Sequence, residues 1–554
     1  MKHMFINSKN TSNLLLLSLI LLVIVGFVIR SYQIESHPPV DNDEFAIAYD
    51  AYSITQTGKD QWGVKMPLFF KSFGDYKNGF DIYITALMYK LFEPNIFWLR
   101  FPSIIFGTLY ILLIFLLLSN ITIDKKLIII GTLLMTLSPY GIFFSRTSSA
   151  SISQSFFTIT SILTFIYYLK SNHKKLIPIS VGSLLLSLYI YPSSLIVVPL
   201  LLSGYIFILL KKHEYTITIL LVVAAFIVAL PVINQYLGGG SMIRFQNVAN
   251  IGMKLEINEF RHHSQNDFVS KIFQNKIVYQ SFYLLKNFIY HFDLEPLIYL
   301  RNHVDQHDNG FPQVLIITFP FYILGFIVLF KQIKNPTYLI IALWIVISPL
   351  PSIIAGSGFN GKRSLTFLGS DIVLIILGLS YFHNIFQKKL VYFLYLICII
   401  INSSIFVYWY FSPYKLLAES HLYFKTNKLY QIVKQNYSKF NTIVYTTKNL
   451  GEPQNPVLFA CLFPPEKYIK IKVAKCSPWC RIQPFDKFIY MENIEDIIKY
   501  ISLNIKDNKI IGFLSSDEIE IIKRKSCYEI LSTFQPKKNY LNEKFYLIQF
   551  EQCI

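Results

Sequence analysis

Apolar segments long enough to cross a lipid bilayer dominate this sequence. A transmembrane helix needs about 20 mostly apolar residues, with a lower limit near 17. Eleven segments approach or meet that length: residues 13–30, 98–119, 126–144, 151–169, 176–191, 193–210, 216–235, 313–330, 337–354, 365–382 and 390–411. The first is too long for a removed signal peptide and lacks a small-residue cleavage site, so we expect it to remain as an anchor. The sequence therefore predicts a polytopic α-helical membrane protein with about eleven transmembrane helices.

The positions of the basic residues predict the orientation. Charged residues make up only 15% of the chain, yet the formal net charge is +18. Alternate short loops carry the lysines Lys2, Lys9, Lys125, Lys126, Lys170, Lys174, Lys175, Lys211, Lys212, Lys331, Lys334, Lys388 and Lys389. The short loops between them carry only Arg146, Lys362 and Arg363. The positive-inside rule then predicts a cytoplasmic N-terminus and, after eleven spans, an extracytoplasmic C-terminal region. We expect the lipid bilayer as a partner and no nucleic acid.

This topology predicts three large pieces on the outer face. We divide the chain into a membrane module, residues 1–411 with outer loops 31–97 and 236–312, and a small extracytoplasmic α/β domain, residues 412–554. In that domain we expect an amphipathic helix over 412–437 and helices near Ile494–Ser502 and Asp517–Arg524. We expect strands at Thr442–Thr446, Tyr468–Val473, Phe488–Met491, Ile510–Leu514, Glu529–Phe534 and Phe545–Phe550. Five cysteines fall there, which makes disulfides plausible in an outer compartment and leaves at least one thiol free.

The polar stretch from Val40 to Asp81 is the strongest candidate for a functional site. It begins Asp41-Asn42-Asp43-Glu44, about ten residues beyond the first span. Acidic groups close to a bilayer usually carry a function or pair with a cation, although spacing alone also fits a solvated loop. We expect helices over Phe45–Thr57 and Phe80–Leu91, both lying along the outer membrane surface.

Three further segments carry candidate binding residues. Arg146, at the outer end of the third span, could bind a phosphate or simply reach the lipid headgroups. Lys362 and Arg363 stand side by side in a glycine-containing turn and could hold a phosphate through charge-assisted hydrogen bonds. His303 and His307 have a spacing that metal ligands use, but with no other clustered ligands we interpret residues 301–308 as a polar loop.

The order of these segments resembles that of the GT-C fold glycosyltransferases that use polyprenyl-phosphate sugars, including the protein O-mannosyltransferases and the lipid A aminoarabinose transferases. The likeness lies in Asp43-Glu44 with the Tyr- and Ala-rich helix behind it, and in the segments 57–67, 100–103, 138–146 and 360–364. No single motif is specific; the resemblance depends on their order within the predicted topology.

The resemblance implies roles for particular residues. Asp43 matches the catalytic carboxylate that takes a proton from the acceptor hydroxyl, and Glu44 matches the acidic position beside it. Arg146 and Arg363, with the adjacent Lys362, match basic positions near the donor phosphate. Lys77 loosely matches a lysine in a Lys-Pro-Pro segment, whose prolines are replaced here by Asn78-Gly79.

The acidic residue that many members carry just after the arginine of the third span is missing from Thr147–Ser151. No cofactor is therefore assigned, and a divalent metal ion stays an open option with no ligands named.

The function implied is transfer of a sugar from a polyprenyl-phosphate donor to a hydroxyl of a protein, lipid or glycan acceptor on the outer face, with inversion at the sugar carbon. One alternative is a polysaccharide polymerase or ligase, in which the basic residues of loop 236–312 would be essential and Asp43 dispensable. The other is a non-enzymatic lipid or sugar transporter. Transporters carry charged or broken helices near the bilayer midplane, and the predicted spans are largely free of charge.

Overall fold

The computed structural model describes residues 9–72, 75–237, 276–293, 311–355, 359–386, 389–421, 423–447, 450, 452–471, 473–476, 480–505, 509–523, 526–536 and 544–551. These residues form two compact units. The membrane unit contains Met1–Tyr32 and Arg100–Tyr408, and the head unit contains Gln33–Leu99 and Trp409–Ile554. The segment predicted as the first outer loop thus folds with the C-terminal residues. The predicted polar loop at 301–308 lies outside the described residues.

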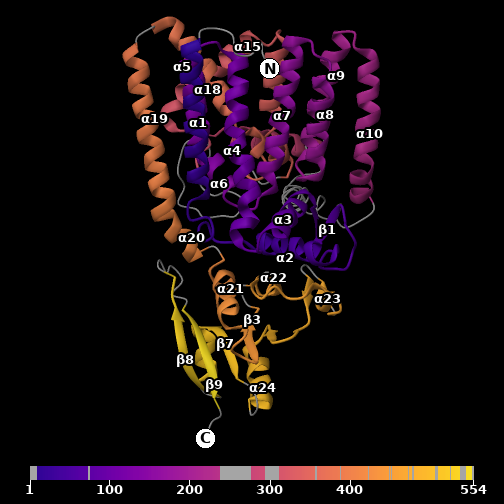
Figure 1. The fold of residues 1–554 in the computed structure, drawn as a ribbon, viewed down its shortest axis with the longest axis vertical. Coiled ribbons are helices and arrows are strands. Elements are labelled where there is room, and N and C mark those ends of the chain that lie inside the picture. The colour runs from indigo at the N-terminus through magenta and orange to yellow at the C-terminus, as the bar shows by residue number, and fades with distance from the viewer. Residues whose placement is uncertain are drawn as a thin grey trace, which may run out of the picture. The chain divides into compact units, whose positions relative to one another are not determined.

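The membrane unit is built from helices, most of which run alongside one another (Figure 1). They are α1 (Lys9–Ser31), α4 (Ile96–Ile121), α5 (Lys125–Thr136), α6 (Pro139–Ser145), α7 (Ala150–Ser171), α8 (Leu176–Leu186), α9 (Ser194–Lys211), α10 (Tyr215–Leu237), α13 (Lys276–His291), α15 (Phe319–Lys331), α16 (Pro336–Ile347), α17 (Leu350–Ile354), α18 (Ser370–Phe386) and α19 (Lys389–Trp409). The short 3₁₀ helices Ser187–Tyr189, Ile316–Thr318 and Leu365–Phe367 extend α8, α15 and α18.

Each of the eleven predicted spans corresponds to an apolar helical stretch. Eight helices within the described residues are long and apolar enough to cross a membrane, and the bent pair α5–α6 makes a ninth if it is one span. The two remaining predictions, 176–191 and 313–330, match shorter apolar helices at Leu176–Tyr189 and Ile316–Lys331. The predicted polytopic helical membrane architecture is confirmed.

Two features shape this helix bundle. Helix α5 stops before Pro139, which has no N–H to continue it, and the Ser138 hydroxyl accepts from Gly141 N to begin α6. The two helices meet at 46°. The backbones of helices α15 and α18 are in contact at Gly325. A Cβ at this position would collide with the Leu374 carbonyl oxygen. Such close approach between membrane helices requires small residues at the contact.

The head unit joins a helix–hairpin–helix segment to an α/β domain. The segment is α2 (Asn42–Thr57), β1 (Phe69–Ser72), β2 (Asp75–Asn78) and α3 (Phe80–Leu91). The domain contains α20 (Lys415–His421), α21 (Phe424–Asn436), β3 (Thr442–Thr446), α22 (Gln454–Ala460), α23 (Pro465–Tyr468), β4 (Val473–Cys476), β5 (Cys480–Ile482), β6 (Phe488–Met491), α24 (Ile494–Asn504), β7 (Ile510–Ser515), α25 (Ser516–Ile522), β8 (Cys527–Phe534) and β9 (Phe545–Glu551).

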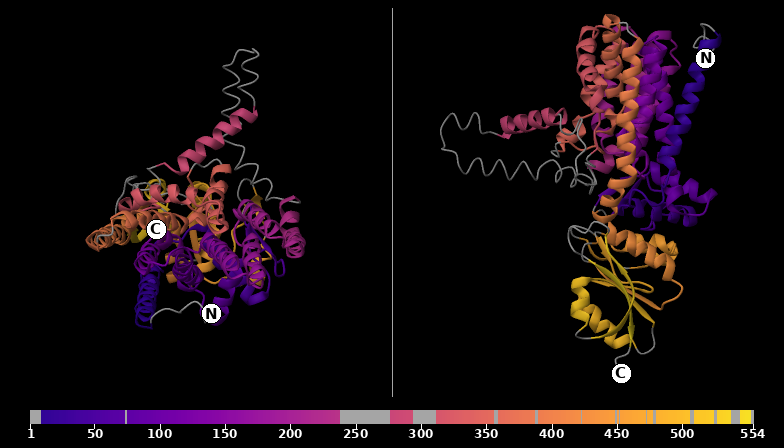
Figure 2. Two further views of the ribbon diagram at one scale, coloured as in Figure 1. Left: turned by 90° about the horizontal axis from the view of Figure 1, so that it is seen from above. Right: turned by 90° about the vertical axis from the view of Figure 1, so that its left-hand side faces the viewer.

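The central sheet has the order β6-β3-β7-β9-β8, in which β3 is parallel to β6 and β7, and β9 is antiparallel to β7 and β8. Side chains alternate across it: Ile443 and Tyr445 pack with α21 and α22, whereas Val444 packs with α24 and α25. The sheet is therefore covered by helices on both faces, as the right panel of Figure 2 shows. Cys527 is disulfide-bonded and Cys461 is free.

Two predictions for this domain need correction. The strand expected at Tyr468–Val473 is wrong, because Pro465 starts the helical turn α23 and the strand begins only at Val473. The single helix expected over 412–437 is divided: a π-helical turn at Tyr410–Tyr414 precedes α20, and Tyr423, with a φ of 53°, separates α20 from α21.

Candidate functional site

Asp43 lies in the first turn of α2, where a helix N-terminus favours negative charge. Asp41 is the N-cap: its Oδ1 accepts from Glu44 N at 2.6 Å, and Glu44 Oε2 accepts from Asp41 N at 3.2 Å. This reciprocal capping box fixes the start of the helix. Glu44 is buried, whereas the Asp43 side chain is 57% exposed. Of the two acidic residues predicted as catalytic, Asp43 thus has the carboxylate open to solvent.

A hairpin places Lys77 on Asp43. Strands β1 and β2 pair antiparallel with Phe70 opposite Lys77, and the Lys77 ammonium lies 3.0 Å from Asp43 Oδ1. The Lys77 side chain is only 17% exposed. Burial alone would lower its pKa, but the carboxylates of Asp43, Glu452 and Asp50 outweigh that effect, so the pKa of Lys77 is raised and the side chain stays cationic. The predicted residues Asp43 and Lys77 therefore form an ion pair.

Asp50 is a buried carboxylate two helical turns beyond Asp43. Its Oδ1 accepts from Gln61 N at 3.1 Å and its Oδ2 from Gln61 Nε2 at 3.0 Å, which ties α2 to the loop behind it. Burial raises the pKa of Asp50 to about 7, and nearby Asp60 adds to the shift, while the Gln61 hydrogen bonds and the Lys77 ammonium oppose it. Asp60 in turn accepts from the backbone N–H groups of Trp62 and Val64.

Glu452, just before α22, is a second buried carboxylate that interacts electrostatically with the Asp43–Lys77 pair. It is 8% exposed and accepts a hydrogen bond from Asn455 Nδ2. Burial raises the pKa of Glu452 to about 7; the Lys77 ammonium and the Asn455 hydrogen bond lower it, whereas Asp43 and Asp50 raise it. Lys77 therefore lies within electrostatic range of three carboxylates, two of them in α2 and one in the α/β domain.

Helix α2 is held on the α/β domain by its aromatic face. Tyr49 Oη donates to Phe463 O at 3.0 Å, and Tyr52 Oη donates to Leu462 O at 3.2 Å. The Phe45 ring packs on Tyr430, and Tyr49 belongs to the same hydrophobic core as strand β3. The C-terminal residues thus position the helix that carries Asp43.

In the membrane unit, Arg146 ends α6 and is completely buried. Its Nη1 donates to the carbonyl oxygens of Ile29 at 2.8 Å and Arg30 at 3.0 Å, at the end of α1. Arg30 is buried as well and donates to Gly26 O, Thr136 O, Met135 O and Ser145 Oγ. Two guanidinium groups therefore lie close together here, and both are anchored on backbone carbonyls.

The loop with Lys362 and Arg363 packs against the same short helix α6. Asn360 organises the turn: its Oδ1 accepts from Arg363 N at 3.0 Å and its carbonyl accepts from Ser364 Oγ at 2.8 Å. The Tyr140 side chain closes over Gly361, and Phe359 packs on the Tyr140 ring. Lys362 and Arg363 are both partly buried. The predicted phosphate-binding residues of this unit thus come from two segments that touch.

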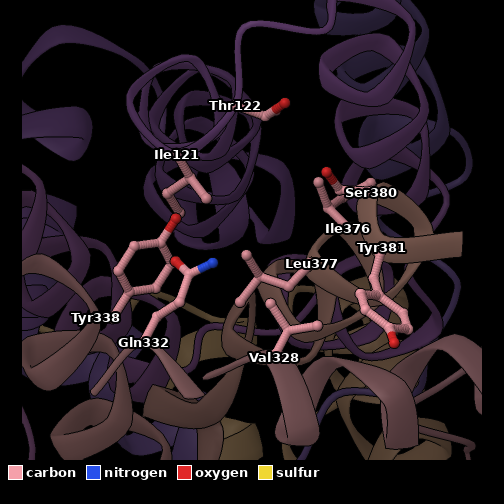
Figure 3. A pocket seen from close by; sticks show the side chains of 9 residues that line it. All are labelled: Ile121, Thr122, Val328, Gln332, Tyr338, Ile376, Leu377, Ser380 and Tyr381. Carbon is pink, nitrogen blue, oxygen red and sulfur yellow. The ribbon is translucent and has the colours of Figure 1, made fainter. Parts of the chain in front are cut away.

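A pocket of about 130 Å³ opens elsewhere in the membrane unit (Figure 3). It lies at one end of α4, α15, α16 and α18, and Thr122, Gln332, Tyr338 and Ser380 supply its polar groups. None of the predicted site residues lines it. It is therefore separate from the candidate site.

The structure groups the predicted residues in two sets: Asp43, Glu44 and Lys77 in the head unit, and Arg146, Lys362 and Arg363 in the membrane unit. Sequence reasoning missed Asp50, Glu452 and Arg30. Arg30 had a visible signal, a cation at the end of the first span away from the lysine clusters. Among the described residues, no three His, Cys, Asp or Glu side chains gather closely enough to hold a metal ion.

Comparison with solved structures reveals the architecture. The ArnT structure from Cupriavidus metallidurans bound to undecaprenyl phosphate superposes with a TM-score of 0.52 at 10% identity, over 96% of this chain and 97% of that one. The chain has a GT-C fold. The apo oligosaccharyltransferase of Archaeoglobus fulgidus gives a TM-score of 0.51 at 12% identity, over 82% of this chain and 64% of the other. The GT-C fold predicted from the order of segments is thereby confirmed.

A second structure of that archaeal enzyme, AglB in complex with an inhibitory peptide and a dolichol-phosphate, gives a TM-score of 0.50 at 11% identity, over 91% of this chain and 70% of the other. No protein-family model and no curated protein matches the sequence. At identities of 10–12% these GT-C structures establish the fold and leave the reaction to be argued from the site.

Proposed function

We propose that this protein is an integral membrane glycosyltransferase that moves a sugar from a polyprenyl-phosphate donor to an acceptor hydroxyl on the outer face, with Asp43 as the general base. The observation that carries the proposal is a solvent-accessible carboxylate, in the first turn of a helix and paired with a lysine, within a GT-C fold. The dolichol-phosphate and undecaprenyl phosphate named for the AglB and ArnT structures support the class of donor.

In the proposed reaction the acceptor oxygen attacks C1 of the sugar while its proton passes to the Asp43 carboxylate. The bond between C1 and the phosphate oxygen breaks, and the phosphate leaves with the electron pair. Because the attack is direct, the configuration at C1 inverts. An alcohol is a weak nucleophile, and a positioned general base accelerates such steps by typically 10²–10⁴-fold.

The departing phosphate needs compensating positive charge. We assign this role to Arg146, Lys362 and Arg363, whose loop and helix pack together in the membrane unit. Lys77 has three N–H donors, so the ammonium that holds Asp43 can also contact a phosphate oxygen. Fixed cations in a partly water-excluded site stabilise developing charge better than water does.

The test is transfer of radiolabelled sugars from a panel of undecaprenyl-phosphate donors in membranes that contain the full chain, with and without a chelator. We expect Asp43→Asn to lower transfer by about a hundredfold or more, the loss of a general base. Asp517→Asn is the matched control, because Asp517 is also an exposed residue in the first turn of a helix, α25. It should transfer at the native rate.

If Asp43→Asn transfers as well as the native chain, Asp43 is not the base and this proposal is wrong. A polysaccharide polymerase or ligase would then be the next hypothesis, tested by chain extension of a lipid-linked glycan. If both aspartate variants lose transfer equally, the loss reflects helix stability rather than chemistry.

A further inference from the structure

The C-terminal α/β domain contributes a charged group to the Asp43–Lys77 pair. Glu452 is the residue that does so, and its burial and its hydrogen bond from Asn455 fix the carboxylate in place. Helix α22, which follows it, packs directly on α2. The carboxylate therefore belongs to a buried contact between the helix that carries Asp43 and the domain that supports it.

We propose that Glu452 is a positioning residue whose charge controls how strongly Lys77 holds Asp43. The inference rests on the function proposed above for Asp43. When Glu452 is protonated and neutral, the Lys77 ammonium forms its ion pair with Asp43 alone. When Glu452 ionises, its negative charge also attracts the Lys77 ammonium, and the ion pair that weakens Asp43 as a base is loosened.

The charged neighbours of Glu452 favour this arrangement. Lys77 in β2, Asp43 and Asp50 in α2, and the phenol of Tyr468 in α23 all interact with it electrostatically. Burial raises the pKa of Glu452 to about 7, so the group changes charge near neutral pH. A like charge beside a carboxylate makes that carboxylate a stronger base. Ionised Glu452 should therefore raise the rate of proton transfer to Asp43.

The first experiment reads the carboxyl group directly and needs no substrate. Infrared difference spectra of the full chain in detergent, native against Glu452→Gln, are recorded across neutral pH. We expect the native spectrum minus the variant spectrum to show a protonated carboxyl band that disappears with a midpoint near 7, while the contribution of Asp50 is present in both chains and cancels. Glu466→Gln, an exposed glutamate in α23, is the matched control and should keep the band. If the native chain shows no band that depends on Glu452, the proposal is wrong.

The second experiment follows kcat and KM with undecaprenyl-phosphate-linked sugars as pH rises. We expect the native kcat to rise several-fold through neutral pH with little change in KM, Glu452→Gln to stay near the low-pH value, and Glu452→Asp to restore part of the rise. If Glu452→Gln keeps the native rise, the proposal is overturned. If Asp50→Asn alone abolishes the rise, the controlling group is Asp50 and the proposal again fails.

Asn455→Leu gives a second variant in case Glu452→Gln folds poorly. The Asn455 hydrogen bond lowers the pKa of Glu452, so its loss should move the midpoint of both titrations to higher pH. An unmoved midpoint would contradict the assignment. A Glu452 band that titrates as expected in a chain that transfers no sugar would leave the electrostatic coupling standing and reject the glycosyltransferase proposal, so the two failures are distinguishable.

Discussion

The Lys77 ammonium lies 3.0 Å from Asp43 Oδ1 and 3.5 Å from the Asp43 carbonyl oxygen. A strand hairpin and the first turn of a helix are thus joined by one side chain. Because the Lys77 side chain is largely buried while the Asp43 side chain is 57% exposed, the cation is fixed and the carboxylate remains accessible to solvent. This asymmetry is what a general base requires: an oriented group with access to the acceptor.

Lys77→Met should destabilise the head unit. It removes the cation that pairs with Asp43 and lowers the pKa of both Asp50 and Glu452, so keeping these carboxylates ionised in the folded chain costs more at neutral pH. We expect a loss of about 1–2 kcal/mol, between the small effect of exposed ion pairs and the larger effect of buried ones. Thermal unfolding in detergent measures it, with Lys65→Met, an exposed lysine of the same segment, as the control. Equal melting temperatures for both variants would contradict the central role of Lys77.

Asp50→Asn should flatten the pH dependence of stability. The pKa of Asp50 is about 7 in the folded chain against about 4 when unfolded, so between these values the folded state binds more protons. Stability from this group is therefore present at low pH and is lost as pH rises towards 7. Asparagine cannot ionise, so the variant should lose less stability over that range.

The Asp50→Asn side chain can be accommodated, because Gln61 Oε1 has no hydrogen-bond partner among the residues that the structure describes, and a flipped amide would accept from the new Nδ2. Melting temperatures across mildly acidic to mildly alkaline pH test the prediction. Asp517→Asn should keep the native pH slope. A slope that is unchanged in Asp50→Asn would show that Asp50 does not titrate in this range.

The transmembrane helices could be predicted from the sequence, because the length and apolar character of each span depend only on residues that are contiguous in the chain. The same holds for α3 at Phe80–Leu91 and for the strands Thr442–Thr446 and Phe488–Met491, which the sequence predicted to the residue. The β1–β2 hairpin was not predicted, since its strands have four residues each and carry no alternating pattern. Glu452 lies about 400 residues from Asp43 in the chain, so only the packing of α22 on α2 could reveal their relationship.

Arg30→Met should weaken the junction between α1 and the bend of α5–α6. Arg30 donates to Thr136 O at 3.2 Å, at the break between α5 and α6 where the regular helical hydrogen bonds end. Leaving such buried acceptors unsatisfied costs about 1–3 kcal/mol. We expect a lower melting temperature and, because Arg146 donates to the backbone at Arg30, a higher KM for the undecaprenyl-phosphate donor. Lys125→Met, at the exposed start of α5, should change neither value.

Gly107→Ala should disrupt the same junction from the side of α4. A Cβ at Gly107 would overlap Ser145 Oγ and lie 2.6 Å from Ser145 Cβ, and Ser145 Oγ accepts from Arg30 Nε at 3.3 Å. Overpacking of this kind costs about 1–3 kcal/mol. Gly182→Ala, in α8, is the matched control: no atom of the described residues lies within 4 Å of its new Cβ, so the better helix propensity of alanine should raise stability by up to about 1 kcal/mol.

We therefore expect Gly107→Ala to lower the melting temperature and Gly182→Ala to raise it. A third variant separates steric overlap from a general effect on α4. Combining Gly107→Ala with Ser145→Gly removes the side chain that the new methyl group meets, so part of the lost stability should return even though the Arg30–Ser145 hydrogen bond is gone. If the double variant is no more stable than Gly107→Ala alone, α4 and α6 do not touch at Gly107 and Ser145. Recovery would establish that contact, and with it the packing that holds Arg146 at the end of α6.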